Sequence, residues 1–254
     1  MKAITDICYC NEHKQYLDLY LPDCESFPVF VYFHGGGLEA GDKGRQGVLY
    51  EYLTGHGIAV VAPNYRTYPD ARYPDFLTDS AKAVAWVFEN VDKYGNATEI
   101  YVGGSSAGGY ISQMLCFDES WLSAHGIKSS DVYGYVHDAG QPTCHFNVLR
   151  ERGIDRRRVI IDGSAPLYHV DGKHSYPPML IIVSDNDMEN RYEQTLLLAS
   201  TLKHFGHAES VSLKIMHGKH CAYVSSKDET GDSVFGKLVL EFICGTKNSV
   251  TRQD

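Results

Sequence analysis

A short run rich in glycine and serine, at positions 103–109, has the clearest chemical potential in this sequence. Within it, residues 104–108 read Gly-Ser-Ser-Ala-Gly and fit the pattern G-x-S-x-G. The run follows an apolar stretch, Ile100–Val102, and precedes a helix-forming stretch, Ala107–Phe117, so the chain should turn sharply from strand to helix there. Such a turn exposes its serine, and Ser106 is therefore the predicted nucleophile for acyl transfer.

The glycines of this run suit a tight turn, because a side chain there would collide with a neighbouring strand or helix. The helix that follows would aim its first amides and its dipole at developing negative charge. A run of this kind can also cradle a phosphate, but no lysine stands in a P-loop position and no acidic residue ends a second strand at the spacing of a dinucleotide site. Ser105 is the alternative nucleophile, and it lies off the register of the motif.

A second glycine run, His34-Gly35-Gly36-Gly37, follows the apolar stretch Val29–Phe33. A carbonyl under nucleophilic attack becomes an oxyanion, which needs backbone N–H groups already directed at it, and glycines let the backbone come that close. His34 is expected to shape this loop by hydrogen bonding rather than to act as a base. The predicted oxyanion donors are the amides of Gly36, Gly37 and Ala107, with Gly35 as an alternative for one of them.

The acid that would support a catalytic histidine is expected in the loop 184–189, which reads Ser-Asp-Asn-Asp-Met-Glu after the strand-like stretch Met179–Val183. In hydrolases with a G-x-S-x-G turn, the acid stands between the serine and the histidine along the chain. Asp187 is preferred because this acid usually lies a few residues beyond the end of the strand. Asp185 and then Glu189 remain alternatives.

The base is expected after the stretch Val211–Ile215, where residues 216–220 read Met-His-Gly-Lys-His. His220 is preferred over His217 because it lies deeper in the loop, after a glycine. His220 would take the proton of Ser106 and return it to the leaving group, while Asp187 would hold the imidazole in the correct tautomer.

Short apolar stretches alternate along the chain with stretches of helical periodicity. This alternation predicts βαβ units and a mainly parallel sheet covered on both faces, and each polar motif above follows a predicted strand, where ligands bind in such sheets. The expected strands are 16–21, 29–33, 58–62, 100–102, 133–136, 179–183 and 211–215, and the expected helices are 77–91, 107–117, 191–205 and 233–243. We expect a single domain over residues 1–245 and a polar tail over residues 246–254.

With these residues in place, the chain resembles the hormone-sensitive-lipase-like esterases of the α/β-hydrolase superfamily, and most of all their compact branch of feruloyl and acetyl-xylan esterase-like proteins. The resemblance covers nearly the whole chain. It rests on the two glycine runs and the His220 loop, and also on Tyr16–Pro22, Asn64-Tyr65-Arg66, Tyr73-Pro74 with Asp79, and Pro177-Pro178. It implies an α/β-hydrolase fold with a mostly parallel central sheet of about eight strands, helices on both faces and a small or absent cap.

The same resemblance implies a serine carboxylesterase that hydrolyses small acyl esters through an acyl-enzyme, with acetyl or hydroxycinnamoyl esters of sugars as candidate substrates. Two positions depart from the family pattern: Leu38 stands where an aromatic residue is common, and Asn64 stands where an aspartate is common. Either change is expected to alter the wall of the pocket.

Because the HGGG run begins at His34, little room precedes it for a large N-terminal cap. An open cleft and small or polar acyl groups are therefore expected. The remaining lid is predicted from residues 117–131 and 141–173. Candidate substrate contacts within the second segment are Gln141, His145, Phe146, Arg150 and Tyr168.

Two other functions are compatible with these residues. An amidase or formamidase similar to kynurenine formamidase would use the same triad, since the leaving group is selected by the shape of the pocket. A non-catalytic binding protein on the same scaffold is the alternative of a different class, and a complete triad with an oxyanion loop argues against it.

The composition limits the kinds of partner that this protein is expected to bind. A net charge of −9 and a pI of about 5.7 give little electrostatic support for binding nucleic acid, and Arg156–Arg158 is too short a run to change that. No apolar stretch approaches the ~18 residues of a membrane span, and residues 1–15 do not resemble a signal peptide. We therefore expect a cytoplasmic protein that acts on a small-molecule ester, with its oligomeric state open.

The seven cysteines form no C-x-x-C pair and are expected to be reduced. No metal or cofactor is expected, because the scattered histidines and cysteines lack ligand spacing.

Overall fold

The computed structural model describes residues 1–250, and of residues 247–250 it describes the backbone alone. In this described part of the chain, eight strands form a sheet with the order β1-β2-β4-β3-β5-β6-β7-β8. The strands are β1 (Lys2–Cys10), β2 (Gln15–Leu21), β3 (Ser26–Phe33), β4 (Ala59–Pro63), β5 (Asn96–Ser105), β6 (Gly134–Asp138), β7 (Met179–Asn186) and β8 (Val211–Lys219).

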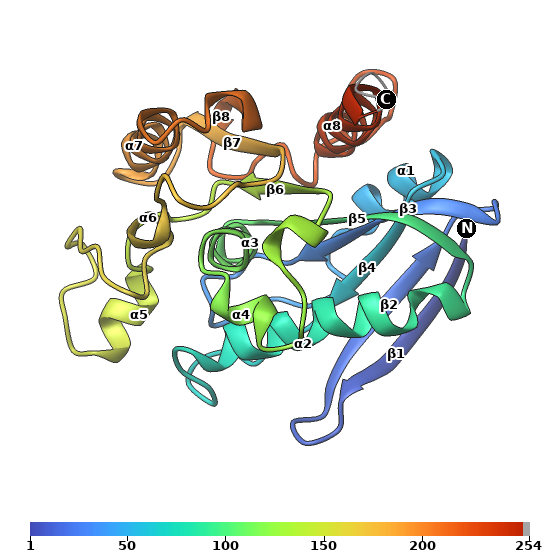
Figure 1. The fold of residues 1–254 in the computed structure, drawn as a ribbon, viewed down its shortest axis with the longest axis horizontal. Coiled ribbons are helices and arrows are strands. Elements are labelled where there is room, and N and C mark those ends of the chain that lie inside the picture. The colour runs from blue at the N-terminus through green and yellow to red at the C-terminus, as the bar shows by residue number, and fades with distance from the viewer. Residues whose placement is uncertain (251–254) are drawn as a thin grey trace.

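The sheet is mostly parallel. Strands β1 and β2 form an antiparallel hairpin, and β2 also pairs antiparallel with β4. All pairs from β4 through β3 to β8 are parallel. Figure 1 shows the β1–β2 hairpin at one end of the twisted sheet and β7 and β8 at the other. The predicted α/β-hydrolase architecture, with a mostly parallel sheet of about eight strands, is confirmed.

Helices cover both faces of this sheet (Figure 1). Helices α1 and α8 pack with one face, and α2, α3 and α7 pack with the other. The helices are α1 (Gly47–Gly55), α2 (Asp75–Asn90), α3 (Ala107–Phe117), α4 (Ser120–Ser123), α5 (Phe146–Glu151), α6 (Pro166–His169), α7 (Arg191–His204) and α8 (Val234–Val250).

The central strand β3 shows why the apolar stretches of this sequence lack alternation. Val29, Val31 and Phe33 lie in the core on the α2–α3–α7 side of the sheet, whereas Phe30 and Tyr32 lie in the core under α1 and α8. A parallel strand with helices on both faces must bury both sets of side chains, so it is apolar throughout.

Helix α3 lies in the middle of the molecule, and all eleven of its residues are buried. It starts beside the carboxyl end of β5 and runs back along the sheet, so it ends at Phe117 near the opposite, amino-terminal edge. Residues 117–131 follow from there, and the expectation that they form part of a lid over the Ser106 loop is therefore wrong.

The long connection between β6 and β7 contains the second expected lid segment, residues 141–173. It carries helices α5 and α6 and a small core of its own, formed by Cys144, Leu149 and Ala165. Helix α6 packs on α3, and Figure 1 shows α5 standing out from the sheet beyond α6. This connection carries only two short helices, so the cap is small, as expected.

Strand β1 and the helices α1, α4, α5 and α6 were not predicted, and the expected start of the tail was wrong. Strand β1 is polar and half-exposed and contains a bulge between Ile4 and Ile7, and α1 begins and ends with glycine, so neither shows a clear periodicity. The expected polar tail from residue 246 is instead helical, since α8 continues to Val250. Thr246 is 7% exposed and its hydroxyl lies 2.8 Å from that of Tyr101. The rest of the expected tail, residues 251–254, lies outside the described residues.

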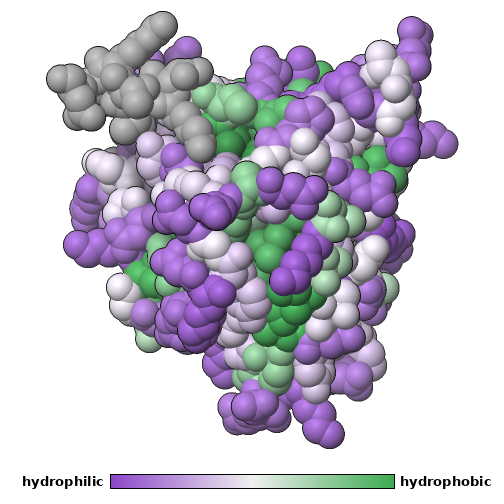
Figure 2. All heavy atoms as spheres, turned by 90° about the vertical axis from the view of Figure 1, so that its right-hand side faces the viewer, coloured by the Kyte–Doolittle hydropathy of each residue, from purple (hydrophilic) through white to green (hydrophobic). Residues whose placement is uncertain are grey.

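The outer surface is predominantly polar. Figure 2 shows one face on which hydrophilic residues surround a narrow strip of hydrophobic ones. The edge strand β8 exposes two large apolar side chains, Leu213 (40%) and Ile215 (46%). Among the residues described, no helix combines the length and the apolar character needed to cross a membrane.

A buried ion pair ties α2 to the loop after β4. The carboxylate of Asp79 is fully buried and accepts two hydrogen bonds of 2.8 Å from the guanidinium of Arg66 and one of 2.9 Å from its backbone amide. We predict that Asp79→Ala lowers the free energy of unfolding by about 3–5 kcal/mol, because it leaves Arg66 without its buried partner.

Denaturant unfolding followed by circular dichroism would measure this loss. The matched control is Asp155→Ala, which removes a similar two-pronged contact with Arg157 at an exposed position and should change stability little. Equal losses in the two variants would contradict the prediction.

Candidate active site

Ser106 stands at the turn between β5 and α3, as the motif predicts. Its backbone is left-handed, with φ 58° and ψ −112°, which is a strained conformation for a residue with a side chain. The neighbouring glycines make this turn possible. A Cβ on Gly108 would lie 1.9 Å from the carbonyl oxygen of Phe33, and one on Gly104 would lie 2.5 Å from Gly108.

The structure brings the three predicted triad residues together. The Nε2 of His220 lies 2.8 Å from the Oγ of Ser106, and its Nδ1 lies 2.5 Å from an Oδ1 of Asp187. Ser106 comes from the β5–α3 turn, Asp187 follows β7, and His220 follows β8. Strands β7 and β8 are neighbours and β6 separates β7 from β5, so the three residues meet at the carboxyl edge of the sheet, where ligand sites of open α/β sheets lie.

The carboxylate of Asp187 is fully buried and well supplied with donors. It accepts hydrogen bonds from the amides of Ser184 (3.3 Å) and Met188 (2.7 Å) in addition to His220. Burial alone would raise the pKa of Asp187, but the hydrogen bond and the charge of His220 lower it below its ordinary value. The acid is therefore ionised beside the imidazole, as a residue that orients a base must be.

Asp185 and His217, the alternatives for the acid and the base, form a separate pair. The Nδ1 of His217 lies 2.7 Å from Asp185, and this histidine side chain is 97% exposed. The exposed Glu189 has no hydrogen bond to either histidine among the bonds found in residues 1–246. Ser105 is buried and accepts a 3.0 Å hydrogen bond from Tyr32, so it does not face His220.

The HGGG loop lies against the nucleophile. A Cβ on Gly35 would be 3.3 Å from the Cβ of Ser106, and one on Gly36, whose φ is +129°, would overlap the carbonyl oxygen of Ala40 at 1.8 Å. The amides of Gly36, Gly37 and Ala107 donate none of the loop and turn hydrogen bonds of the described residues. They are therefore free to donate to a ligand beside Ser106.

His34 supports this loop from within the protein. It is buried, its ring stacks on Tyr65 at 4.4 Å between centroids, and its Nδ1 lies 2.8 Å from the carbonyl oxygen of Gly35. Burial lowers the pKa of His34. These contacts agree with the expectation that His34 shapes the loop rather than acting as a base.

Helix α5 provides a second support, which the sequence did not reveal. The side-chain amide nitrogen of Asn147 donates a hydrogen bond to the carbonyl oxygen of Gly37. Arg150, one turn later, pairs with Glu39 and lies 4.7 Å above the ring of Tyr68. The α5 segment therefore fixes the far end of the HGGG loop, although its residues are more than a hundred positions away in the sequence.

The predicted substrate contacts divide into two groups. Gln141 and His145 are buried and occupied, since Gln141 bonds Thr143 and Cys144 and accepts from Arg191, and His145 caps α5 by accepting from the amide of Asn147. Neither is available to a ligand, so both expectations are wrong.

Phe146 is half-buried, and its ring lies 3.3 Å from the position of a Cβ on Gly37, so it borders the site. Tyr168 lies with Asp118 and His169 near the opposite edge of the sheet, away from the triad.

The two departures from the family pattern do not line the cleft. Leu38 is fully buried in the core. Asn64 holds the loop that follows the HGGG run, because its side chain bonds the amide of Lys43 at 2.6 Å and the carboxylate of Asp42 at 3.1 Å. The expectation that they alter the pocket wall is therefore wrong.

Arg191, the first residue of α7, was also missed. It is 3% exposed and donates hydrogen bonds to the carbonyl oxygen of Ala139 and to Gln141. Its charge also contributes to lowering the pKa of Asp187. A buried arginine is costly unless its donors are used, so Arg191 fixes the loop after β6 against the loop that holds the acid.

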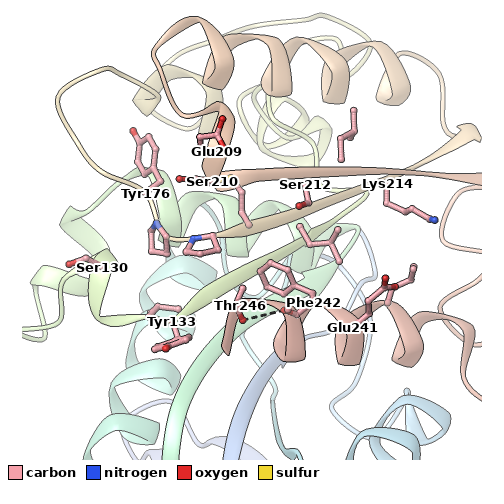
Figure 3. Close-up of a pocket in the computed structure, with 18 of the residues that line it drawn as sticks. Ser130, Tyr133, Tyr176, Glu209, Ser210, Ser212, Lys214, Glu241, Phe242 and Thr246 are labelled. Atoms are coloured by element: carbon pink, nitrogen blue, oxygen red, sulfur yellow. Dashed lines mark hydrogen bonds between the residues drawn. The ribbon is translucent and has the colours of Figure 1, made fainter. Parts of the chain in front are cut away.

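A separate groove lies at the other end of the sheet. It has a volume of about 760 Å³ and is lined by residues that precede or begin β6, β7 and β8, together with Leu238 and Phe242 of α8. Figure 3 shows Tyr133, Tyr176 and Phe242 around it. No triad residue lines this groove, and the amino ends of the strands are the opposite edge from Ser106.

Comparison with known proteins gives a family assignment. The model of the BD-FAE family matches residues 17–148, which include the HGGG loop and the Ser106 turn. The chain belongs to this family. Esterase LipC of Mycobacterium tuberculosis is 27% identical over 221 residues, which cover 78% of this chain and 54% of LipC. The chain thus spans about half the length of LipC and about a third of the length of the isoprenylcysteine methylesterases that it also matches.

Solved structures share the fold over nearly the whole chain. Esterase B from Lactobacillus Rhamnosis (HN001) superposes with a TM-score of 0.80 at 18% identity, and the match covers 99% of this chain and 88% of that one. A truncated carbohydrate esterase from gut microbiota superposes with a TM-score of 0.77 at 20% identity, covering 98% and 97%. These likenesses confirm the α/β-hydrolase fold, and the family match supports the resemblance noted in the sequence.

The lowered pKa of Asp187 implies a dependence of stability on pH. An acid whose pKa is lower in the folded than in the unfolded state stabilises the fold above its unfolded pKa and loses this contribution as the pH falls. We predict that wild type is more stable than Asp187→Asn at neutral pH and that the difference shrinks as the pH falls below 3.8, the ordinary value.

Unfolding free energies of both proteins, measured between pH 6 and the lowest pH at which they fold, would test this. A difference that stays constant or grows toward acid would be incompatible with an ionised, hydrogen-bonded Asp187.

Proposed function

We propose that this chain is a serine carboxylesterase in which Ser106, His220 and Asp187 form the catalytic triad within one α/β-hydrolase domain. The observation that carries the proposal is the continuous chain from the Ser106 hydroxyl through His220 to Asp187, with contacts of 2.8 and 2.5 Å. A nucleophile, a base within reach of it and a buried acid that orients the base are the requirements of acyl transfer.

The chemistry follows from this arrangement. His220 removes the proton of Ser106 as its Oγ attacks the ester carbonyl, and the amides of Gly36, Gly37 and Ala107 stabilise the oxyanion that forms, with Gly35 as an alternative donor. His220 then gives the proton to the leaving alcohol, which departs and leaves an acyl-enzyme. Water, deprotonated by His220, hydrolyses the acyl-enzyme and restores Ser106.

The relatives support the ester as the bond that is cleaved. LipC is named an esterase, and isoprenylcysteine α-carbonyl methylesterases and a carboxylesterase are among the other similar proteins. Among the structures with the same fold is a carbohydrate esterase. Acetyl or hydroxycinnamoyl esters of sugars are therefore our candidate substrates.

The surroundings of Ser106 favour a small acyl group. The ring of Phe146 stands beside Gly37, and the Glu39–Arg150 pair and Tyr68 continue that wall with polar and charged groups. A long alkyl chain would find little continuous apolar surface along such a wall, whereas a short or polar acyl group would fit it.

The two aspartate–histidine pairs offer a matched test of the mechanism. We predict that His220→Ala lowers kcat for p-nitrophenyl acetate by about 10³-fold or more, because it removes the base, while His217→Ala stays within about twofold of wild type. Both variants lose a histidine hydrogen-bonded to an aspartate, so the loss of such a pair is common to the two and only His220→Ala also removes the base beside Ser106.

Labelling with a fluorophosphonate, followed by peptide mapping, identifies the nucleophile in the same samples. The adduct should be on Ser106 in wild type and in His217→Ala and should form far more slowly in His220→Ala. An unlabelled folded wild type, or an adduct on another serine, would reject the proposal and favour a binding protein on this scaffold.

The size of the acyl group gives a further prediction. Wild type should hydrolyse p-nitrophenyl acetate with a kcat/KM about tenfold or more above that for the laurate ester, and Phe146→Ala should reduce this preference by about threefold or more because it widens the wall beside Gly37. Tyr168→Ala is the matched control, since it removes an exposed aromatic ring of the same connection far from the triad.

Steady-state kinetics with the two esters would measure the preference. A laurate preference in wild type would refute the small-acyl assignment. Faster turnover of N-formylkynurenine than of either aryl ester would replace the esterase with a formamidase that uses the same triad.

A further inference from the structure

A buried acid that the mechanism above does not use lies directly behind the nucleophile. Asp138, the last residue of β6, is completely buried, and it is paired in the sheet register with Ser105 on the neighbouring strand β5. It follows a predicted strand just as the other polar motifs do, yet it makes no hydrogen bond to Ser106 Oγ or His220 among the bonds found in the described residues.

The contacts of Asp138 on one side hold the Ser106 turn. Its carbonyl oxygen accepts a 2.8 Å hydrogen bond from the amide of Ser106. Its carboxylate is hydrogen-bonded by Ser105, whose own oxygen accepts a 3.0 Å bond from the hydroxyl of Tyr32. Strands β3, β5 and β6 are thereby joined directly beneath the nucleophile.

The contacts on the other side hold the His220 loop. The hydroxyl of Tyr223, three positions after His220, donates a hydrogen bond to an Oδ1 of Asp138. The thiol of Cys221 lies 3.9 Å from the other carboxylate oxygen and 3.6 Å from the Nε2 of His220. Cys221 has a φ of 52°, so the chain reverses sharply after His220 and brings Tyr223 back under the sheet.

We propose that Asp138 is a positioning residue that sets the distance between Ser106 and His220, by binding the serine turn through Ser105 and its own carbonyl and the histidine loop through Tyr223. The proposal rests on the function proposed above. In this proposal, one buried side chain connects two loops that otherwise approach each other only across the active site.

The cost of burying this carboxyl supports a role beyond packing. Burial raises the pKa of Asp138 to about 6, while hydrogen bonds from Ser105 and Tyr223 and the charge of His220 oppose the rise and that of Asp187 adds to it. The other groups beside it are the guanidinium of Arg191, which bonds the next carbonyl along the chain, and the thiol of Cys221, which is uncharged because burial raises its pKa. An apolar side chain would fill the position at lower cost but would bind neither loop.

Tyr223→Phe tests the link to the histidine loop, because it removes one hydroxyl and leaves the ring in place. Its matched control is Tyr135→Phe, which alters a fully buried tyrosine of β6 that takes no part in these contacts. We expect Tyr223→Phe to lower kcat for p-nitrophenyl acetate about tenfold or more with KM within about twofold, and Tyr135→Phe to leave both unchanged. Asp138→Asn should behave as Tyr223→Phe does.

A second measurement needs no turnover. The proton on Nδ1 of His220, in its bond to Asp187, should give a downfield NMR signal in wild type and Tyr135→Phe, and this signal should broaden or be lost in Tyr223→Phe. Wild-type kcat together with an unchanged signal in Tyr223→Phe and Asp138→Asn would overturn the proposal. If wild type itself hydrolyses no ester and takes no fluorophosphonate, the proposed function fails and the NMR signal alone decides the role of Asp138.

Discussion

The active site depends on how closely helix α3 approaches strand β3. No side-chain carbon fits between them, since a Cβ on Gly108 would nearly coincide with the carbonyl oxygen of Phe33. This contact places the end of β3, and therefore the HGGG loop that follows it, directly against the serine at the start of α3. The nucleophile and the oxyanion donors are thus positioned by the same backbone contact, and the strained φ of Ser106 is held by a helix that is buried along its full length.

The two aspartate–histidine pairs show how the environment separates groups of identical chemistry. Asp185–His217 and Asp187–His220 have similar distances, 2.7 and 2.5 Å, and both pairs come from the carboxyl ends of β7 and β8 or the residues just after them. The first histidine is 97% exposed, whereas the second is 22% exposed and its partner is fully buried. Only the second pair has a low-dielectric setting and a serine within reach, and both are needed for the histidine to take the serine proton while the ionised aspartate orients its ring.

The sequence predicted those parts of the site that follow directly from a strand and a glycine motif. Ser106, Asp187 and His220 each follow an apolar strand, so their meeting at one edge of a parallel sheet could be foreseen. Residues that act across long sequence distances could not: Asn147 reaches the HGGG loop from α5, and Arg191 crosses from α7 to the loop after β6. Gln141 and His145 were misjudged because their polarity serves internal hydrogen bonds of the connection. Asp138 could have been singled out from the sequence, because it too stands at the end of an apolar strand.

The connection between β6 and β7 has a core of its own, made of Cys144, Leu149 and Ala165 with Ile154 and Ile160 packed on it. It meets the reacting groups through few contacts, chiefly Asn147 on the HGGG loop and Phe146 beside it. A segment with a core of its own can change in length or sequence away from its contacts with α3 and the HGGG loop without disturbing the sheet that aligns the triad. The molecule therefore separates what must stay fixed from what can diverge, and new substrate preferences can evolve in this segment while the catalytic machinery is inherited intact.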